Sequence, residues 1–177
     1  MRMRGFQLFL KKENQIGKIN KMSSDELIKK SLESSKTIAM VGVSSLKKEE
    51  NPKMIRRRPS TIVMKYMQEF GYKVIPVNPF AVGEKIHGET VIDNLENIKT
   101  PIDIVNIFRP SKETPILANQ AVKIKTKVLW LQYGIQNEEA KKIATEANIS
   151  YVENRCIKQE YQKIFQKMSP VFPALKL

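Results

Sequence analysis

The sequence predicts an α/β protein with a Rossmann-like fold, in which a doubly wound, five-stranded parallel sheet forms the middle of three α/β/α layers. Short runs that are almost entirely apolar alternate along the chain with stretches in which apolar residues recur at helical spacing. Strands that are apolar on both faces are typical of parallel sheets covered by helices. The strands also stop at residues that favour turns. A length of 177 residues fits one such domain.

The first half of the chain opens with a helix. Ser23–Glu26 has the spacing of a capping box and precedes an apolar stripe that runs to about Ser34. Residues 37–43 are nearly all apolar, which predicts a strand buried on both faces. Residues 62–70 return to helical spacing, and a second strand over residues 72–77 ends at an Asn-Pro pair.

The second half repeats the alternation of strand and helix. The expected elements are, in order, a strand over 102–108, a helix over 114–124, a strand over 127–131, a helix over 137–147, a strand over 149–152 and a helix over 157–168. Pro115 is tolerated in the first turn of its helix. Asn137 supplies a cap to the next helix, and the two acids that follow it suit the positive end of that helix.

Right-handed crossovers between these strands make a doubly wound sheet the expected topology, with strand order 3-2-1-4-5. Ligands of such sheets bind outside the carboxyl ends of the strands. The segments to inspect for a site therefore directly follow the strands. They are Gly42, Val43 and Ser44; Asn78 and Pro79; Phe108, Arg109 and Pro110; Gln132, Tyr133 and Gly134; and Asn154, Arg155 and Cys156.

The net charge is +13, and most of the excess lies in residues 1–36 and 47–58. We expect residues 1–22 to be a basic extension, residues 23–168 to form the folded domain, and residues 169–177 to be a tail. Clustered Lys and Arg can be a solvated surface, but they also attract phosphate whatever the base sequence. Nucleic-acid binding therefore stays an alternative function.

Composition also bears on the compartment and on catalysis. No apolar run approaches the ~20 residues that cross a bilayer, so we expect no membrane attachment. A single cysteine cannot form an internal disulfide, which favours the reducing cytoplasm. His87 has no partners at metal-ligand spacing, Ser44 has no expected histidine partner, and Cys156 is expected to be packed rather than reactive. We therefore expect neither a metal site nor an enzyme.

The turn after the first strand bears on the choice of cofactor. Residues 42–47 hold one glycine, where the fingerprint of nicotinamide dinucleotide sites requires three. The second strand ends at Asn78, where a ribose-binding acid would be expected. Both features count against NAD, and an NAD(P)-linked oxidoreductase remains the alternative by fold.

An ordered set of sequence blocks carries a family resemblance. The blocks are Thr37–Ser44, Arg58–Ser60, Gly71–Pro79, Ile102–Arg109, Trp130–Gln132, Asn137–Ala140 and Asn154–Cys156. Together they resemble the small CoA-binding proteins of bacteria and archaea, whose single domain is similar to the CoA-binding N-terminal domain of the succinyl-CoA ligase alpha subunit. The resemblance spans about residues 23–165. It implies that CoA or an acyl-CoA binds across the carboxyl edge of the sheet, and it implies no established reaction.

The resemblance also implies a role for each candidate residue. The pyrophosphate would be held by N–H groups around Gly42, Val43 and Ser44 and by the helix start formed by Arg58, Pro59, Ser60 and Thr61. Asn78 and Pro79 would lie at the adenosine, Phe108, Arg109 and Pro110 would flank the adenine or the pantetheine, and Gln132, Tyr133 and Gly134 would line the far side. We expect Gly42→Val to abolish CoA binding and to leave the fold largely intact.

The chain departs from the family pattern in three places. The loop over residues 44–60 is longer and more basic, and we expect Lys53, Arg56, Arg57 and Arg58 to help neutralise the phosphates of CoA. Residues 125–127 replace the usual Gly-Ala-Lys turn, and His87 takes a usually apolar turn position. The sequence does not identify a particular acyl-CoA, a protein partner or an oligomeric state.

Overall fold

The computed structural model describes residues 23–45 and 58–166. The expected extension, the tail and the basic loop up to residue 57 lie outside the described residues. The helices are α2 (Ser24–Ser34), α3 (Pro59–Glu69), α4 (Thr114–Lys123), α5 (Glu138–Glu146) and α6 (Ile157–Phe165). The strands are β1 (Thr37–Val41), β2 (Lys73–Val77), β3 (Lys85–Ile86), β4 (Glu89–Thr90), β5 (Ile104–Ile107), β6 (Val128–Leu131) and β7 (Ser150–Val152), with short 3-10 turns at Leu95–Asn97 and Ser111–Glu113.

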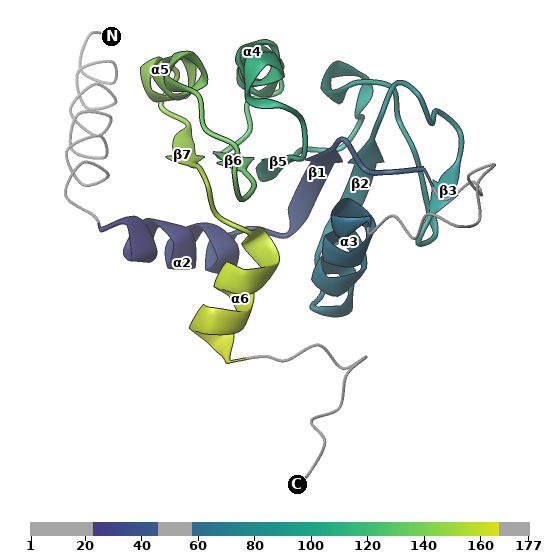
Figure 1. Cartoon of the computed structure of the whole chain (residues 1–177), viewed down its shortest axis with the longest axis horizontal. Coiled ribbons are helices and arrows are strands. Elements are labelled where there is room, and N and C mark those ends of the chain that lie inside the picture. The colour runs from purple at the N-terminus through teal and green to yellow at the C-terminus, as the bar shows by residue number, and fades with distance from the viewer. Residues whose placement is uncertain (1–22, 46–57, 167–177) are drawn as a thin grey trace, which may run out of the picture.

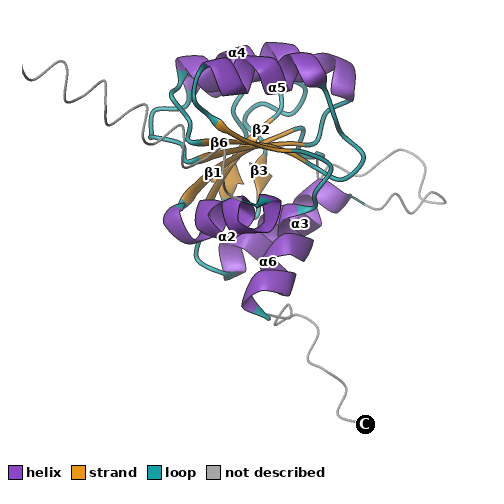
Figure 2. Ribbon diagram, turned by 90° about the vertical axis from the view of Figure 1, so that its left-hand side faces the viewer, coloured by secondary structure: helices purple, strands orange, loops and turns teal. Residues whose placement is uncertain are grey.

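The expected fold class is confirmed. Strands β1, β2, β5, β6 and β7 form a parallel sheet of five strands. Helices α4 and α5 cover one face of this sheet, and α2, α3 and α6 cover the other (Figures 1 and 2). Strands β3 and β4 form a separate antiparallel hairpin. None of the helices in residues 23–45 and 58–166 is long and apolar enough to cross a membrane.

The expected strand order is wrong. The observed order is β2-β1-β5-β6-β7, which places the third expected strand beside the first one instead of beside the second. The position next to β2 is taken by Ile92, which forms an isolated parallel bridge with Val77. The segment around Ile92 is too short for the sequence to predict a strand there. The sequence therefore predicts the strand over residues 102–108 beside β2, at the edge that Ile92 occupies.

The core has two halves, one on each face of the sheet. Ile38 and Met40 pack in the cluster with α2, α3 and α6, whereas Ala39 and Val41 pack in the cluster with α4 and α5. This alternation is what a strand buried on both faces requires. Trp130 is fully buried in the first cluster, and its indole Nε1 donates a hydrogen bond to the Arg155 carbonyl at 2.7 Å. The tryptophan is therefore a core residue.

Helices α2 and α5 begin at the expected capping residues, whereas α3 begins without a side-chain cap. Ser23 and Glu26 form a reciprocal capping box at α2, and Asn137 accepts a hydrogen bond from the first turn of α5. Helix α3 instead begins at Pro59 with no side-chain cap. Ser60 thus lies inside the first turn, where its Oγ accepts a hydrogen bond from the N–H of Ser44.

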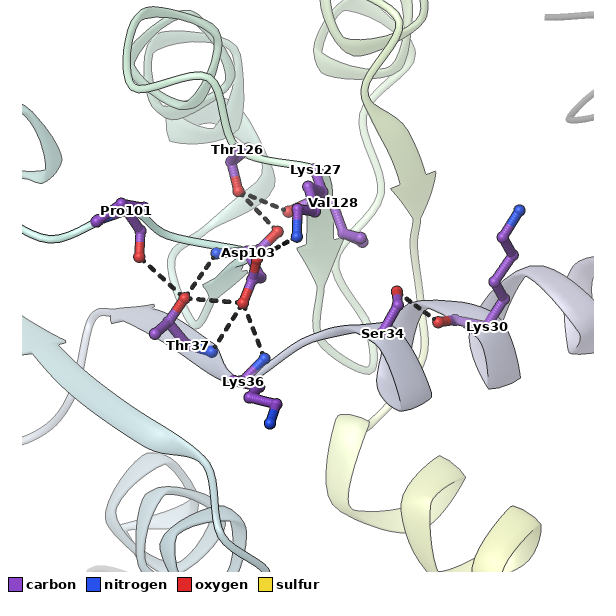
Figure 3. Close-up of polar contacts among 9 residues, drawn as sticks. All are labelled: Lys30, Ser34, Lys36, Thr37, Pro101, Asp103, Thr126, Lys127 and Val128. Carbon is purple, nitrogen blue, oxygen red and sulfur yellow. Dashed lines mark hydrogen bonds and ion pairs between the residues drawn. The ribbon is translucent and has the colours of Figure 1, made fainter. Parts of the chain in front are cut away.

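The amino end of the sheet is held together by Asp103, as Figure 3 shows. Its Oδ2 accepts hydrogen bonds from the backbone N–H groups of Lys36 and Thr37 at 2.8 and 3.1 Å, and its Oδ1 lies 2.7 Å from Nζ of Lys127. Burial disfavours the charged carboxylate, but the bonds from Lys127, Lys36 and Thr37 outweigh it and lower the pKa of Asp103 to about 2. One carboxylate therefore joins β1, β5 and β6 at the end opposite the candidate site.

Candidate functional site

Strand β1 ends at a tight turn, and the conformation of Gly42 makes this turn possible. Gly42 has φ +85°, a left-handed conformation that L residues with side chains rarely adopt. Its N–H, which we expected to face the ligand, donates instead to the Val77 carbonyl at 2.8 Å. The turn therefore belongs to the sheet, and its own amide is not free for a phosphate.

Two side chains tie the segment after this turn to its neighbours. The N–H of Ser44 donates to Oγ of Ser60 at 3.0 Å, which connects the end of the β1 segment to the first turn of α3. Asn78 donates from Nδ2 to the Val43 carbonyl at 2.9 Å, and its Oδ1 accepts from the N–H of Phe80. The ends of β1 and β2 and the start of α3 thus form one connected edge.

A first cavity of about 440 Å³ opens at this edge and is called here the polar cavity. It is lined by Val41, Gly42, Val77, Asn78, Pro79, Phe80, Asp93, Asn94, Arg109, Glu113, Leu117 and Gln120. Phe80 and Leu117 give it an aromatic and an aliphatic wall, and most of the other side chains are amides or charged groups. Its volume lies within the range of small-molecule sites, roughly 300–1,000 Å³.

The charged groups of the polar cavity are already paired. Arg109 binds Glu113 through two hydrogen bonds, at 2.8 Å from Nε and 3.0 Å from the guanidinium nitrogen Nη2. Asp93 accepts hydrogen bonds from Nδ2 of Asn97 at 2.8 and 2.9 Å, and these bonds lower its pKa. An ionised carboxylate that accepts hydrogen bonds therefore stands in the cavity wall beside a neutralised arginine.

A second cavity of about 400 Å³ lies at the same edge and is called here the apolar cavity. It is lined by Pro59, Val63, Phe108, Gln132, Tyr133, Ile135, Cys156 and Gln159. Two amides and a thiol are the polar groups among otherwise aliphatic and aromatic side chains. Pro59 brings the start of α3 into this wall, while Gly42 brings the residue after β1 into the wall of the polar cavity.

An amide pair lies behind the apolar cavity. Gln132 is only 4% exposed, and its Nε2 donates to Oδ1 of Asn106 at 2.7 Å. Asn106 is fully buried, and its Nδ2 has no hydrogen-bond partner among the described residues. A buried donor without a partner lowers the stability of a protein by roughly 1–3 kcal/mol, so the unpartnered amide nitrogen of Asn106 is an unfavourable feature of the core behind this cavity.

The structure divides the expected site residues between the two cavities and leaves several outside both. Gly42, Asn78, Pro79 and Arg109 line the polar cavity. Pro59, Phe108, Gln132 and Tyr133 line the apolar cavity. The residues that line neither cavity are Val43, Ser44, Arg58, Ser60, Thr61, Pro110 and Gly134. Of these, Ser44 and Ser60 join the segment after β1 to the first turn of α3 through a hydrogen bond.

Sequence reasoning missed several cavity residues. Asp93 and Asn94 directly follow Ile92, which pairs with β2. The sequence signal that could have identified them is the apolar pair Val91-Ile92, which resembles the end of a strand. Cys156, which follows a strand and is expected to be packed, does pack half-buried against the core, and it also lines the apolar cavity. His87 is exposed, and its Nε2 lies 3.0 Å from the Thr61 carbonyl, so it fastens the β3–β4 hairpin to α3.

Comparisons with known proteins identify the family. A model of the CoA binding domain matches residues 36–162. The protein YneT of Bacillus subtilis is 39% identical over 131 residues, which are 74% of this chain and 89% of that protein. A solved Thermus thermophilus structure superposes with a TM-score of 0.70 at 33% identity, covering 80% of this chain and 98% of the other. A Pyrococcus horikoshii protein does so with a TM-score of 0.70 at 38% identity, covering 81% and 93%. The chain therefore belongs to the CoA binding domain family.

Proposed function

We propose that this protein binds coenzyme A, or an acyl-CoA, and that it acts as a binding module without a reaction of its own. The observation that carries the proposal is the pair of cavities at the carboxyl edge of the sheet, one with amide and charged side chains in its wall and one lined mostly by aliphatic and aromatic side chains. CoA has the same division, because a nucleotide and a mostly aliphatic pantetheine arm are joined through a pyrophosphate. Membership of the CoA binding domain family supports the same ligand.

The chemistry of the polar cavity suits the adenosine. Phe80 is 84% exposed at the rim, where an aromatic face can stack on a base, and Leu117 adds apolar surface to the cavity wall. The amides of Asn78 and Asn94 offer both donors and acceptors to the edge of a base or to ribose hydroxyls.

The apolar cavity suits the pantetheine arm. That arm carries two methyl groups on one carbon, two amides and a terminal thiol. Val63, Phe108 and Ile135 supply apolar surface for the aliphatic part, while Gln132 and Gln159 supply amides for hydrogen bonds. Apolar side chains thus match the aliphatic part of the arm, and side-chain amides match its amides.

The pyrophosphate would then lie near Ser44 and the start of α3. Ser44 and Ser60 lie there, with their hydroxyl oxygens 3.3 Å apart, and the amino end of the α3 dipole favours an anion. Basic residues of the loop before Arg58 are available in the sequence to add positive charge. A ligand with a free thiol and a chain with one cysteine both suit the reducing cytoplasm, where we propose that the protein acts.

A nicotinamide dinucleotide is the second candidate, and Asp93 is the observation that favours it. The sequence has no acid at the end of the second expected strand, but Asp93 lines the polar cavity together with Asn78, which follows that strand. A carboxylate in this region of a Rossmann fold binds ribose hydroxyls. The single glycine in the first turn still counts against this candidate.

The test is a pair of tryptophan variants on adjacent positions of α4. Leu117 lines the polar cavity, whereas Ile116 is 67% exposed and lies outside both cavities. Leu117→Trp should fill the adenosine site and lower CoA affinity at least tenfold, while Ile116→Trp should leave it unchanged. Affinities are measured by isothermal titration calorimetry with CoA, dephospho-CoA, NAD and a short DNA duplex.

The outcomes separate the candidate functions. Tight binding of CoA to the wild type, lost only in Leu117→Trp, supports the proposal. Preference for NAD over CoA would favour the second candidate, and binding of the duplex alone would favour the nucleic-acid alternative. Equal CoA affinity in both variants would show that the polar cavity is not the adenosine site.

A further inference from the structure

Cys156, the single cysteine of the chain, lies in the wall of the apolar cavity. It occupies the N-cap position of α6, is half-buried, and makes no side-chain capping hydrogen bond to that helix. The backbone of Cys156 fixes its place, because its carbonyl accepts a hydrogen bond from the N–H of Glu160 at 3.0 Å. Its thiol is therefore held at the cavity by a helix start that does not use it.

Gln132 independently indicates that this cavity receives a ligand with an N–H group. Its Nε2 donates to Asn106, and none of the hydrogen bonds among the described residues uses its Oε1 oxygen. The residue is only 4% exposed and lines the cavity, and its Oε1 is not among the polar atoms buried from solvent without a partner, so a donor can reach it from the cavity. A carbonyl oxygen in this position is satisfied when a ligand amide donates to it.

We propose that Cys156 forms a reversible mixed disulfide with the thiol end of CoA held in the apolar cavity. The proposal rests on the proposed function, and it adds a covalent step to it. The pantetheine arm carries amides on the way to its terminal thiol. An amide held by Gln132 would leave that terminal sulfur within the same cavity as Sγ of Cys156.

The step is a thiol–disulfide exchange with the symmetric disulfide of CoA as co-reactant. The Cys156 thiolate attacks one sulfur of the CoA disulfide, a new S–S bond forms to that sulfur, and the original S–S bond breaks. The leaving group is a CoA thiolate, which takes up the proton that Cys156 released. Cys156 is oxidised, one CoA sulfur is reduced, and a thiol reductant reverses the step.

Such a bond would make the occupancy of the site depend on redox conditions. Disulfides of cytosolic proteins are typically transient and serve redox sensing or catalysis. A covalently held CoA would leave the site only after reduction, and the bond would protect Cys156 from further oxidation to the sulfinic state. The fraction of sites occupied by CoA would thus rise when CoA disulfide accumulates.

The experiment measures the rate of adduct formation by intact-protein mass spectrometry on the full chain. Wild type, Cys156→Ser and Leu117→Trp are each mixed with CoA disulfide and, separately, with glutathione disulfide. In the wild type we expect one CoA adduct per chain, formed at least tenfold faster than the glutathione adduct and removed by dithiothreitol. Cys156→Ser should form no adduct with either disulfide.

Leu117→Trp is the decisive control because it leaves Cys156 and the apolar cavity untouched. If the adenosine anchors CoA, this variant should lose the rate advantage of CoA disulfide and keep the slow reaction with glutathione disulfide. Equal rates for the two disulfides in the wild type, or no CoA adduct, would overturn the inference while reduced CoA still binds. Failure of reduced CoA to bind in the presence of reductant would instead overturn the proposed function.

Discussion

The α-carbon of Gly42 lies so close to Phe108 that a Cβ built on the glycine would stand 2.8 Å from the Phe108 carbonyl oxygen. The same Cβ would lie 2.8 Å from Cδ of Arg109. Because the Phe108 carbonyl is a backbone group directly after β5, a side-chain rotation cannot relieve this clash. The glycine is thus required by the packing of two strand ends, whether or not a ligand is bound.

Gly42→Ala should therefore destabilise the protein in the absence of any ligand. The left-handed conformation costs a residue with a side chain about 1–2 kcal/mol, and overpacking adds about 1–3 kcal/mol. Gly83→Ala is the matched control, because Gly83 has φ +80° and nothing within 4 Å of its Cβ position. Urea unfolding should show that Gly83→Ala loses only the first contribution to the free energy of unfolding.

This expectation replaces the one drawn from the sequence, that Gly42→Val would abolish binding and leave the fold largely intact. A valine meets the same carbonyl with a larger side chain, so loss of CoA binding in that variant would reflect damage to the fold. Equal unfolding midpoints for Gly42→Ala and Gly83→Ala would show that the strand ends can separate without cost.

The parts of the fold that the sequence predicted rest on local patterns. Apolar runs identified the five parallel strands, and the Ser23 and Asn137 caps identified the starts of α2 and α5, because these signals depend on residues close together in the chain. Strand order depends on which strands pair across the sheet. The two-residue pairing of Ile92 with β2 leaves almost no local signal, so the order was wrong.

The candidate site shows the same limit. The rule that ligands bind at the carboxyl ends of parallel strands identified Asn78, Arg109 and Gln132, each of which follows a strand. The rule does not say which face of the sheet each side chain takes. Separation into a polar and an apolar cavity therefore required the structure, as did the presence of Leu117 from the middle of a helix.

Asp103→Asn should lower the free energy of unfolding by up to about 2.5 kcal/mol at pH 7. The folded-state pKa of about 2 lies below the ordinary value of 3.8, and each unit of difference corresponds to about 1.4 kcal/mol. The folded state therefore favours the ionised carboxylate. Its contribution to stability is present above about pH 4 and is lost as the pH falls toward 2.

Chemical denaturation of both proteins between pH 2 and pH 7 tests this dependence. The difference in the free energy of unfolding between wild type and Asp103→Asn should shrink steadily below pH 4. Glu96→Gln is the control, because the Glu96–Lys123 pair is largely exposed and such pairs contribute little. A constant difference over the whole range would show that the carboxylate charge is not what stabilises the sheet edge.

The basic loop yields a prediction from its charge. Arg56, Arg57 and Arg58 replaced together by Gln should weaken CoA binding, weaken dephospho-CoA binding less, and reduce the dependence of CoA affinity on salt. Titrations at low and high salt measure all three effects. Equal losses for the two ligands would exclude a role at the 3′-phosphate, and unchanged affinities would make the loop an ordinary charged surface.

Asp93 distinguishes the two nucleotide candidates by the sign of its effect. Its carboxylate stands in the polar cavity and is held ionised by Asn97. CoA brings a 3′-phosphate on its ribose, which a carboxylate in the same cavity repels, whereas the free ribose hydroxyls of NAD would donate hydrogen bonds to it. Asp93→Asn keeps the shape and an oxygen that can accept from Asn97 while removing the charge. We therefore expect this variant to bind CoA severalfold more tightly.

The comparison is made by calorimetry at low salt, where the charge effect is largest. A CoA-binding site predicts that the gain is greater for CoA than for dephospho-CoA, because dephospho-CoA lacks the repelled phosphate. If the site instead binds NAD, Asp93→Asn should weaken the binding of NAD. The neutral amide accepts a hydrogen bond from a ribose hydroxyl less strongly than the carboxylate does. Weaker binding of CoA in Asp93→Asn would mean that the carboxylate contacts the CoA ribose itself, with its 3′-phosphate directed away from the cavity.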